Sequence, residues 1–206
     1  YQGGMNFCQP ETHNLTSDGG TTGKSCTSEV PVLYYTVAVF YKAFGYHDSI
    51  YRIFNTLLFF LGLFFLFRLL QYLLKDLFWA IAITLLFFSS PILVFYGNNY
   101  LSNSSALAFS IVGWYYFIRF SFESKPKWFY FSMGLFMLAA AFKVTAAFSL
   151  FAIAGIYVSE LLGVKKFKEG GKLFPQQFQF LIPFFLVLSV IALWLFYAAY
   201  FNRKHD

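Results

Sequence analysis

The sequence has little charge. Only 12% of its 206 residues are charged, whereas 59% are hydrophobic and 31 are phenylalanine. A soluble domain carries about 25% charged residues, so this composition excludes an ordinary soluble fold and indicates a polytopic membrane protein. The net charge of +6 would suggest a nucleic-acid ligand in a soluble domain. Here the basic residues fall between apolar stretches, where they set membrane topology, and no nucleic-acid partner is expected.

The motifs of soluble enzymes are also missing. The chain has no glycine-rich phosphate loop, no nucleophile elbow, no kinase signature and no His/Cys pattern at metal-binding spacing. A metal site is not expected from these residues, and a divalent cation held by carboxylates outside this sequence stays an open alternative. The only cysteines, Cys8 and Cys26, lie in the polar opening segment. An oxidising exterior would permit a disulfide between them; the alternatives are two free thiols, or partners in an N-terminal part that this sequence lacks.

The start of the chain carries no sign of a signal peptide. It opens on Tyr1 rather than Met, and no basic region with a short apolar core precedes the polar segment. We therefore expect the chain to be a fragment that lacks its true N-terminus.

Long apolar stretches predict an all-α fold, a polytopic bundle of about six membrane-crossing helices in a single domain. Residues 1–50 are expected to form an external loop with an interfacial helix at about 31–44, and residues 51–206 the transmembrane region. Pro91 should kink the second crossing. The predicted crossings are 51–71, 77–96, 101–120, 128–142, 144–162 and 178–200.

Three basic clusters separate these crossings: Arg68 with Lys75; Arg119 with Lys125 and Lys127; and Lys165, Lys166, Lys168 and Lys172. By the positive-inside rule these clusters are cytoplasmic. The opening segment and the uncharged turn 97–103 therefore face the opposite side.

Lys143 is the most informative single residue. It is the only charged residue between Trp128 and Ser159, and an ammonium group within a membrane is costly unless it has a partner or a function. The prediction is a polar site near the outer tip of a short helical hairpin. The alternative is a lysine whose stem snorkels to the interface.

Other polar residues gather on the same predicted face, and each has a structural alternative. Glu29 is either functional or a carboxylate at a helix N-terminus. Arg52 is either a ligand or an interface anchor, and the Asn98-Asn99 pair is first of all a turn signal. The candidate substrate-binding set is Lys143, Tyr96, Asn98, Asn99, Asn103 and Arg52, with Glu29 as a possible catalytic residue.

The order of these features resembles the GT-C superfamily of integral membrane glycosyltransferases, in the group related to aminoarabinose transferase and protein O-mannosyltransferase. The resemblance covers nearly the whole chain. It rests on hydropathy and on a few anchors: Pro31, Gly45, the Ser-Pro and Tyr-Gly pairs of the second crossing, and the hairpin lysine. The segments that carry it are SEVPVLYYTVAVFYKAFG, RIFNTLLFFLGLFFLFRLL, SSPILVFYGNNYLSNSSALAFSIVGWYYFIRF and KWFYFSMGLFMLAAAFKVTAAFSLF.

The resemblance implies a sugar donor linked to polyprenyl or dolichyl phosphate, and a glycan, lipid or protein acceptor. It also implies an active face outside the cytoplasm, at a bacterial inner or plasma membrane. Lys143 would lie beside the lipid phosphate, and Glu29 would lie near the site. The family's catalytic Asp or Glu would fall upstream of Tyr1, and Asn103 stands where relatives often carry an acidic residue. The rival predictions are a transporter or flippase for a lipid-linked or anionic substrate, and an accessory membrane subunit without activity.

Overall fold

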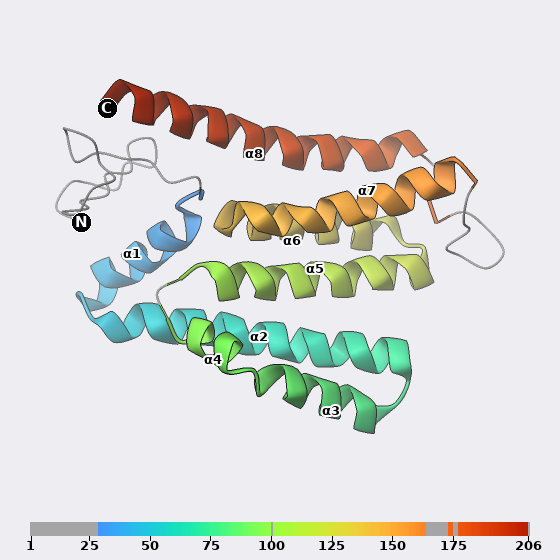
Figure 1. Ribbon diagram of the computed structural model, residues 1–206, viewed down its shortest axis with the longest axis horizontal. Helices are drawn as coiled ribbons and strands as arrows, with labels where there is room; N and C mark the ends of the chain where they lie inside the picture. Colours follow the sequence, from blue (N-terminus) through green and yellow to red (C-terminus); the bar gives the residue numbers. More distant parts are fainter. Residues whose placement is uncertain (1–28, 100, 164–172, 175–176, 206) are drawn as a thin grey trace.

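The computed structural model describes residues 29–99, 101–163, 173–174 and 177–205, and every element in these ranges is a helix (Figure 1). The all-α prediction is therefore confirmed for this part of the chain. The predicted Cys8–Cys26 disulfide and the basic cluster at 165–172 lie outside the described residues. The helices are α1 (Val32–Phe44), α2 (Asp48–Leu74), α3 (Leu77–Phe88), α4 (Pro91–Gly97), α5 (Asn103–Glu123), α6 (Pro126–Phe142), η2 (Val144–Ala147), α7 (Phe148–Leu161) and α8 (Gln177–His205).

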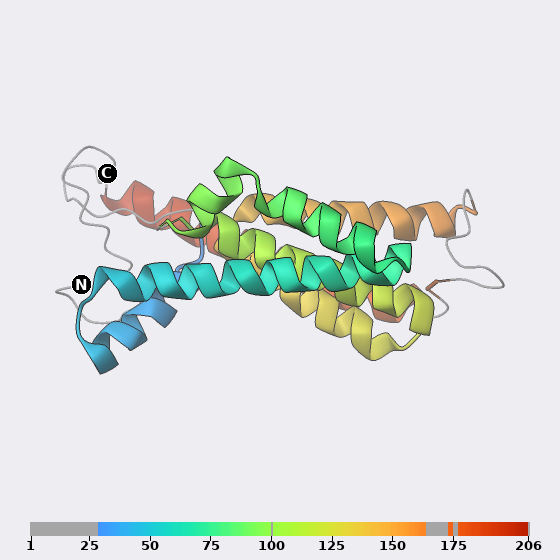
Figure 2. The same ribbon diagram turned by 90° about the horizontal axis from the view of Figure 1, so that it is seen from below.

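The long helices lie side by side, and the chain runs back and forth between two ends of the bundle (Figures 1 and 2). The α2–α3 turn, the α5–α6 turn and the end of α7 lie at one end, which we call the basic end because it holds Lys75, Lys125 and Lys127. The start of α2, the α4–α5 turn and the α6–η2 junction lie at the other, which we call the Lys143 end. Two of the three predicted basic clusters thus share one end.

The α2–α3 turn is built by two adjacent residues. Lys75 takes the left-handed conformation, with φ of 54°, and its backbone N–H donates to the Gln71 carbonyl, which ends α2. Asp76 then begins α3, because its carboxylate accepts hydrogen bonds from the backbone N–H groups of Phe78 and Trp79 at 2.8 and 3.2 Å. The two helices are therefore antiparallel neighbours.

Pro91 breaks the second predicted crossing rather than only kinking it. α3 and α4 meet at an angle of 72° across Ser89 and Ser90. Pro91 lacks an N–H group and holds Ser90 in extended backbone, with ψ of 116°, so the helix stops and restarts. The Ser89 hydroxyl donates to the Leu86 carbonyl at 2.7 Å, as expected for a serine beside a break.

The six predicted crossings are not confirmed. Within the described ranges, three helices are long and apolar enough to cross a membrane: α2, the joined η2–α7 segment and α8, with the bent α3–α4 pair as a possible fourth. α5 and α6 fall outside this set. α1 is apolar but has only 13 residues, and its predicted place at the membrane interface stays a prediction. Membrane character is therefore supported by several long apolar helices.

α5 and α6 form the centre of the bundle. They bury phenylalanines against each other and against α7 and α8, with Phe120, Phe129 and Phe136 at most 1% exposed. Small residues bring the helices close: a Cβ on Gly113 would lie 2.8 Å from the Phe136 ring, and the buried Ser132 hydroxyl donates to the Gly113 carbonyl at 2.8 Å. Such contacts are typical of helix packing in membranes, where close van der Waals contact drives association.

Candidate functional site

The predicted lysine has a partner. Lys143 lies at the junction of α6 and η2, where the backbone is extended, and its Nζ contacts Glu29 Oε1 at 2.6 Å. The Ser102 hydroxyl donates to the other carboxylate oxygen, Oε2, at 2.8 Å. Glu29 therefore links three segments: the chain before α1, the α4–α5 turn and the α6–η2 junction. The Lys143 side chain is 38% exposed and that of Glu29 17%, so the pair is only partly in contact with solvent.

This arrangement shows what each of the two side chains contacts. Lys143 forms an ion pair with a residue of another segment, and its functional role stays a prediction. Glu29 lies two residues before the N-cap position of α1, Pro31, and its carboxylate contacts Lys143 and Ser102 of other segments. The backbone N–H of Val30 donates to the Ala141 carbonyl at 2.9 Å, which fixes the Glu29 segment along the end of α6.

A groove of about 440 Å³, which we call the Lys143 groove, lies between α5 and the η2–α7 segment. Lys143 and Asn103 line it at the Lys143 end, and apolar side chains such as Ile111 line it farther along α5. Trp114 also lines it, and its indole N–H donates to the Ser149 hydroxyl at 3.2 Å. Among the described residues, no hydrogen-bond partner meets the buried Oδ1 of Asn103. The groove therefore has a cationic head and a mainly apolar wall.

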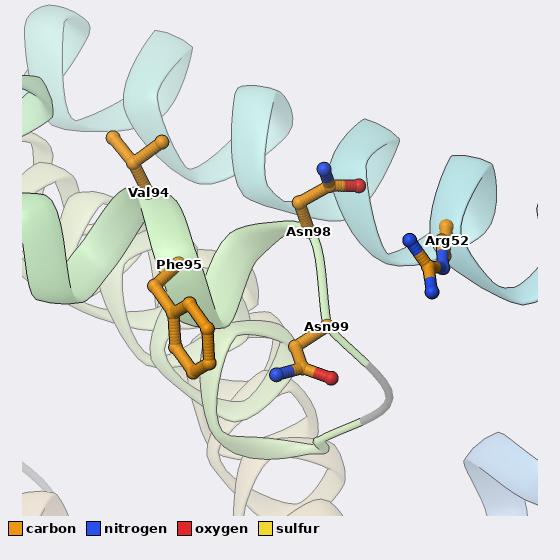
Figure 3. Close-up of a pocket in the computed structure, with 5 residues that line it drawn as sticks. All are labelled: Arg52, Val94, Phe95, Asn98 and Asn99. Carbon is orange, nitrogen blue, oxygen red and sulfur yellow. The ribbon is translucent and has the colours of Figure 1, made fainter.

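A second pocket, which we call the Arg52 cleft, has a volume of about 360 Å³ and is lined by Arg52, Val94, Phe95, Asn98 and Asn99 (Figure 3). It lies between the first turns of α2 and the end of α4. The structure therefore divides the predicted substrate-binding set. Lys143 and Asn103 line the groove, Arg52 and the two asparagines line the cleft, and Tyr96 is absent from the lining of both.

Asn55 organises the region between the two pockets, and the sequence analysis missed it. Its side chain is 0% exposed, and its Nδ2 donates to the carbonyls of Asn99 and Leu101 at 2.7 and 3.1 Å. Its Oδ1 accepts a hydrogen bond from the Ser105 hydroxyl. A buried amide with satisfied donors and acceptor fixes its neighbours in place. The signal was available, because Asn55 is an amide among mainly apolar residues near the start of a predicted crossing.

A second polar cluster lies at the basic end. Glu123 pairs with Arg119 and with Lys125, the latter at 3.1 Å, and accepts a hydrogen bond from the Trp128 indole at 2.9 Å. The Arg119 guanidinium also lies 4.1 Å from the Trp128 ring centre. Hydrogen bonds from Arg119 and then Trp128 lower the pKa of Glu123 to about 2. This cluster fixes the α5–α6 turn.

Metal binding gains no support from the part of the chain that the structure describes. No three His, Cys, Asp or Glu side chains come together there as a metal site would require. Glu160, the buried carboxylate of α7, instead accepts hydrogen bonds from the backbone N–H groups of Leu173 and Phe174. Its role in the structure is to hold the segment before α8.

Comparison with known proteins adds no relative: no family model, no curated protein and no solved structure matches this chain. The resemblance to the GT-C superfamily therefore stays a prediction that rests on the motifs in the sequence.

Proposed function

We propose that the protein is an integral membrane glycosyltransferase, which moves a sugar from a polyprenyl- or dolichyl-phosphate donor to a glycan, lipid or protein acceptor. The observation that carries the proposal is the position of Lys143 at the head of an otherwise largely apolar groove. A lipid-phosphate sugar has the same polarity along its length, because an anionic group joins a sugar to a long apolar tail.

For this reaction the groove must hold the donor in position and supply a positive charge beside its phosphate. The acceptor hydroxyl attacks the anomeric carbon, the bond from that carbon to the phosphate oxygen breaks, and the lipid phosphate leaves with the bonding electrons. A base takes the hydroxyl proton. An ammonium group beside the phosphate stabilises the negative charge that develops on it. Lys143 can supply that charge as its contact with Glu29 is exchanged for one with phosphate.

Glu29 suits a positioning role better than the role of base. Its two carboxylate oxygens already accept from Lys143 and Ser102, so it orients the ammonium group toward the groove. As the family resemblance implies, the base would be an Asp or Glu other than Glu29.

The proposal puts the Lys143 end on the extracytoplasmic side, because Lys75, Lys125 and Lys127 lie at the opposite end. In a bacterium this would be the outer face of the inner membrane. The active face and the donor are then on the side where envelope glycans are assembled.

The test is transfer of a radiolabelled sugar from polyprenyl phosphate by the full-length protein in liposomes. Lys143→Ala and Lys143→Gln are expected to lower kcat about a hundredfold, the usual effect of removing one group that stabilises a developing charge. Lys42→Gln is the matched control, because Lys42 is an exposed lysine in the last turn of α1. It should keep wild-type transfer.

Two results would contradict this function. Wild-type transfer by Lys143→Ala would remove the residue from the mechanism. Movement of intact labelled donor across the liposome membrane, without cleavage of its glycosidic bond, would support the transporter or flippase alternative instead.

A further inference from the structure

Two side chains close the far end of the Lys143 groove. Along α5 the lining runs from Asn103 to Trp114, and along the η2–α7 segment, which runs in the same direction, it extends from Lys143 to Ser149. Among the described residues that line the groove, Trp114 and Ser149 therefore lie farthest from the Lys143 end. The Trp114 indole N–H donates to the Ser149 hydroxyl at 3.2 Å, so this contact, which we call the Trp114–Ser149 bridge, joins the two walls.

The Trp114 ring is also held by two other aromatic rings. It makes edge contacts with Phe117 of its own helix and with Phe136 of α6, with ring centres 5.5 and 5.6 Å apart. Both phenylalanines are at most 2% exposed. The indole therefore contacts α5, α6 and α7, and its N–H has the partner that a partly buried indole needs. These contacts set the position of the ring, and with it the end of the groove, before any ligand binds.

The bridge limits the length of the groove. Eleven residue steps separate Asn103 from Trp114, and at about 1.5 Å each they place the two residues about 16 Å apart along α5. The groove volume of about 440 Å³ lies within the range of about 300–1,000 Å³ that encloses a drug-sized molecule. A complete polyprenyl tail is longer than this space. Only the part of the tail next to the phosphate can therefore lie between Lys143 and the bridge.

We propose that the Trp114–Ser149 bridge is a specificity determinant, which limits how much of the tail of a prenyl phosphate the groove encloses; the identity of the ligand rests on the proposed function. With the phosphate beside Lys143, the first isoprene units lie along Leu107 and Ile111 of α5, and a later unit meets the Trp114 ring. The units beyond it stay in the surrounding membrane and add nothing to the affinity for the groove. The groove therefore recognises the start of the tail and accepts any greater length.

Binding of plain prenyl phosphates tests this inference without a sugar and without turnover. The full-length protein in nanodiscs would be titrated with citronellyl, farnesyl, geranylgeranyl and undecaprenyl phosphate, and native mass spectrometry would count the bound lipid. Each Kd is expressed as a mole fraction of the nanodisc lipid, so that partition of longer tails into the bilayer does not count as binding. In the wild type the affinity should rise with tail length and then reach a plateau.

Trp114→Ala should move that plateau to a longer tail. Its affinity for undecaprenyl phosphate should be about tenfold higher than that of the wild type, the gain from burying about two more methylene groups. The matched control is Trp79→Ala, because Trp79 is 57% exposed and belongs to α3. This control should leave the whole series unchanged.

Variants of Ser149 keep the test valid if Trp114→Ala fails to fold. Ser149→Ala keeps the indole and removes its partner, so it should move the plateau in the same direction and raise the affinity for undecaprenyl phosphate about threefold, half of that gain as free energy. Ser149→Thr keeps the hydroxyl and should keep the wild-type plateau. Ser121→Ala is the control, because the Ser121 hydroxyl donates to the Ile118 carbonyl within α5. It should leave the series unchanged.

Three outcomes would overturn the bridge as a specificity determinant. One is a wild-type affinity that rises steadily through the whole series without a plateau. The second is a plateau that neither Trp114→Ala nor Ser149→Ala moves. The third is a folded Trp114→Ala variant that loses affinity for every member by the same factor, which would mean that the ring only supports the structure.

Lys143→Gln separates this inference from the proposed function. It acts on the phosphate, so it should weaken the binding of every member by the same factor and keep the plateau where it is. Transfer that depends on Lys143, together with a plateau that the bridge variants do not move, would overturn the role of the bridge alone. Transfer that does not depend on Lys143 would overturn the proposed function, and the binding series would still decide whether the bridge limits the enclosed tail.

Discussion

At the scale of single residues, a few polar side chains determine the arrangement of the Lys143 end. Asn55 holds the α4–α5 turn through backbone carbonyls, and Glu29 joins that turn to Lys143 through Ser102. In an apolar environment, breaking such a bond lowers stability in two ways: the hydrogen bond is lost, and a buried polar group is left without a partner. Both pockets therefore depend on residues that line neither of them.

Asn55→Ala should lower the free energy of unfolding by about 2–4 kcal/mol, because it removes two hydrogen bonds to backbone carbonyls and leaves those carbonyls and the Ser105 hydroxyl to find new partners. Chemical unfolding in detergent micelles measures the loss. Asn98→Ala, at an exposed asparagine of the same turn, is the control and should change the value by less than about 0.5 kcal/mol. Equal stability of the two variants would show that Asn55 does not hold the turn.

The sequence drew attention to individual polar residues and did not predict which of them lie together. Lys143, Arg52 and the Asn98-Asn99 pair attract notice because each is polar within an apolar chain. Their division between two pockets follows from the 72° bend between α3 and α4, whose direction a local pattern does not give. The Glu29–Lys143 pair joins residues far apart in the chain, so no local spacing predicts it.

At the scale of helices, single residues mark several of the helix ends. Gly45 ends α1, Asp76 caps α3 and Pro91 opens α4, and the predicted ranges 31–44 and 51–71 fall on α1 and α2. The α5 and α6 ranges were also predicted as helices. The hydropathy pattern did not predict that α5 and α6 are the most buried helices. A helix that contacts other helices can carry buried serines such as Ser104 and Ser105 of α5, which lower its apolar signal, whereas α6 is apolar but has only 17 residues.

Gly62→Ala should destabilise the contact between α2 and α5 by about 1–3 kcal/mol, the usual range for overpacking. A Cβ on Gly62 would lie 2.9 Å from both the Cα and the Cβ of Ala108, so a backbone must move to accept it. Gly134→Ala is the matched control, because a Cβ there meets no described atom within 4 Å. Thermal unfolding in micelles should show a lower Tm for the first variant only. A Tm for Gly62→Ala equal to that of Gly134→Ala would exclude tight packing at this crossing.

The α5–α6 turn should show a pH dependence that Glu123 causes. Glu123 lies beyond the predicted crossing 101–120, and its pKa of about 2 is below the ordinary value of 4.5. A carboxylate with a lowered pKa in the folded state stabilises the protein above its unfolded pKa, and that contribution is lost as pH falls from about 4.5 toward 2. Across this window the Tm of the wild type should fall more steeply than that of Glu123→Gln.

Arg119→Gln tests whether the ion pair causes this pH dependence, because the hydrogen bond from Arg119 is the largest contribution to the lowered pKa of Glu123. This variant should reduce the slope of Tm against pH as Glu123→Gln does. A Glu123→Gln variant that follows the wild-type slope between pH 4.5 and 2 would rule out the ion-pair cluster as its origin.

At the scale of the whole molecule, the alternation of the chain between two ends gives the topology. The α2–α3 and α5–α6 turns carry lysines at the basic end, whereas the α4–α5 turn and the α6–η2 junction lie at the Lys143 end with the two pockets. If α5 and α6 are embedded beside α2 and α7, each must cross the membrane, although α5 is less apolar than α2 and α6 has only 17 residues. The alternation then agrees with the positive-inside rule at both described turns.

Cysteine labelling in sealed right-side-out vesicles tests this topology. In a Cys8→Ser, Cys26→Ser background, a membrane-impermeant maleimide should label Asn98→Cys and Thr145→Cys, two exposed positions at the Lys143 end. Lys127→Cys, an exposed position after the α5–α6 turn, should react only after the vesicles are permeabilised. The cysteine-free background is the control and should stay unlabelled.

The three positions bracket the two helices in question. α5 separates Asn98 from Lys127, and α6 separates Lys127 from Thr145, so opposite accessibility of the middle position requires both helices to cross. Labelling of all three from the outside would mean that α5 and α6 do not cross, and the six-crossing prediction would then be wrong. Labelling of Lys127→Cys alone would invert the orientation and put both pockets on the cytoplasmic side, which is incompatible with a donor site at the extracytoplasmic face.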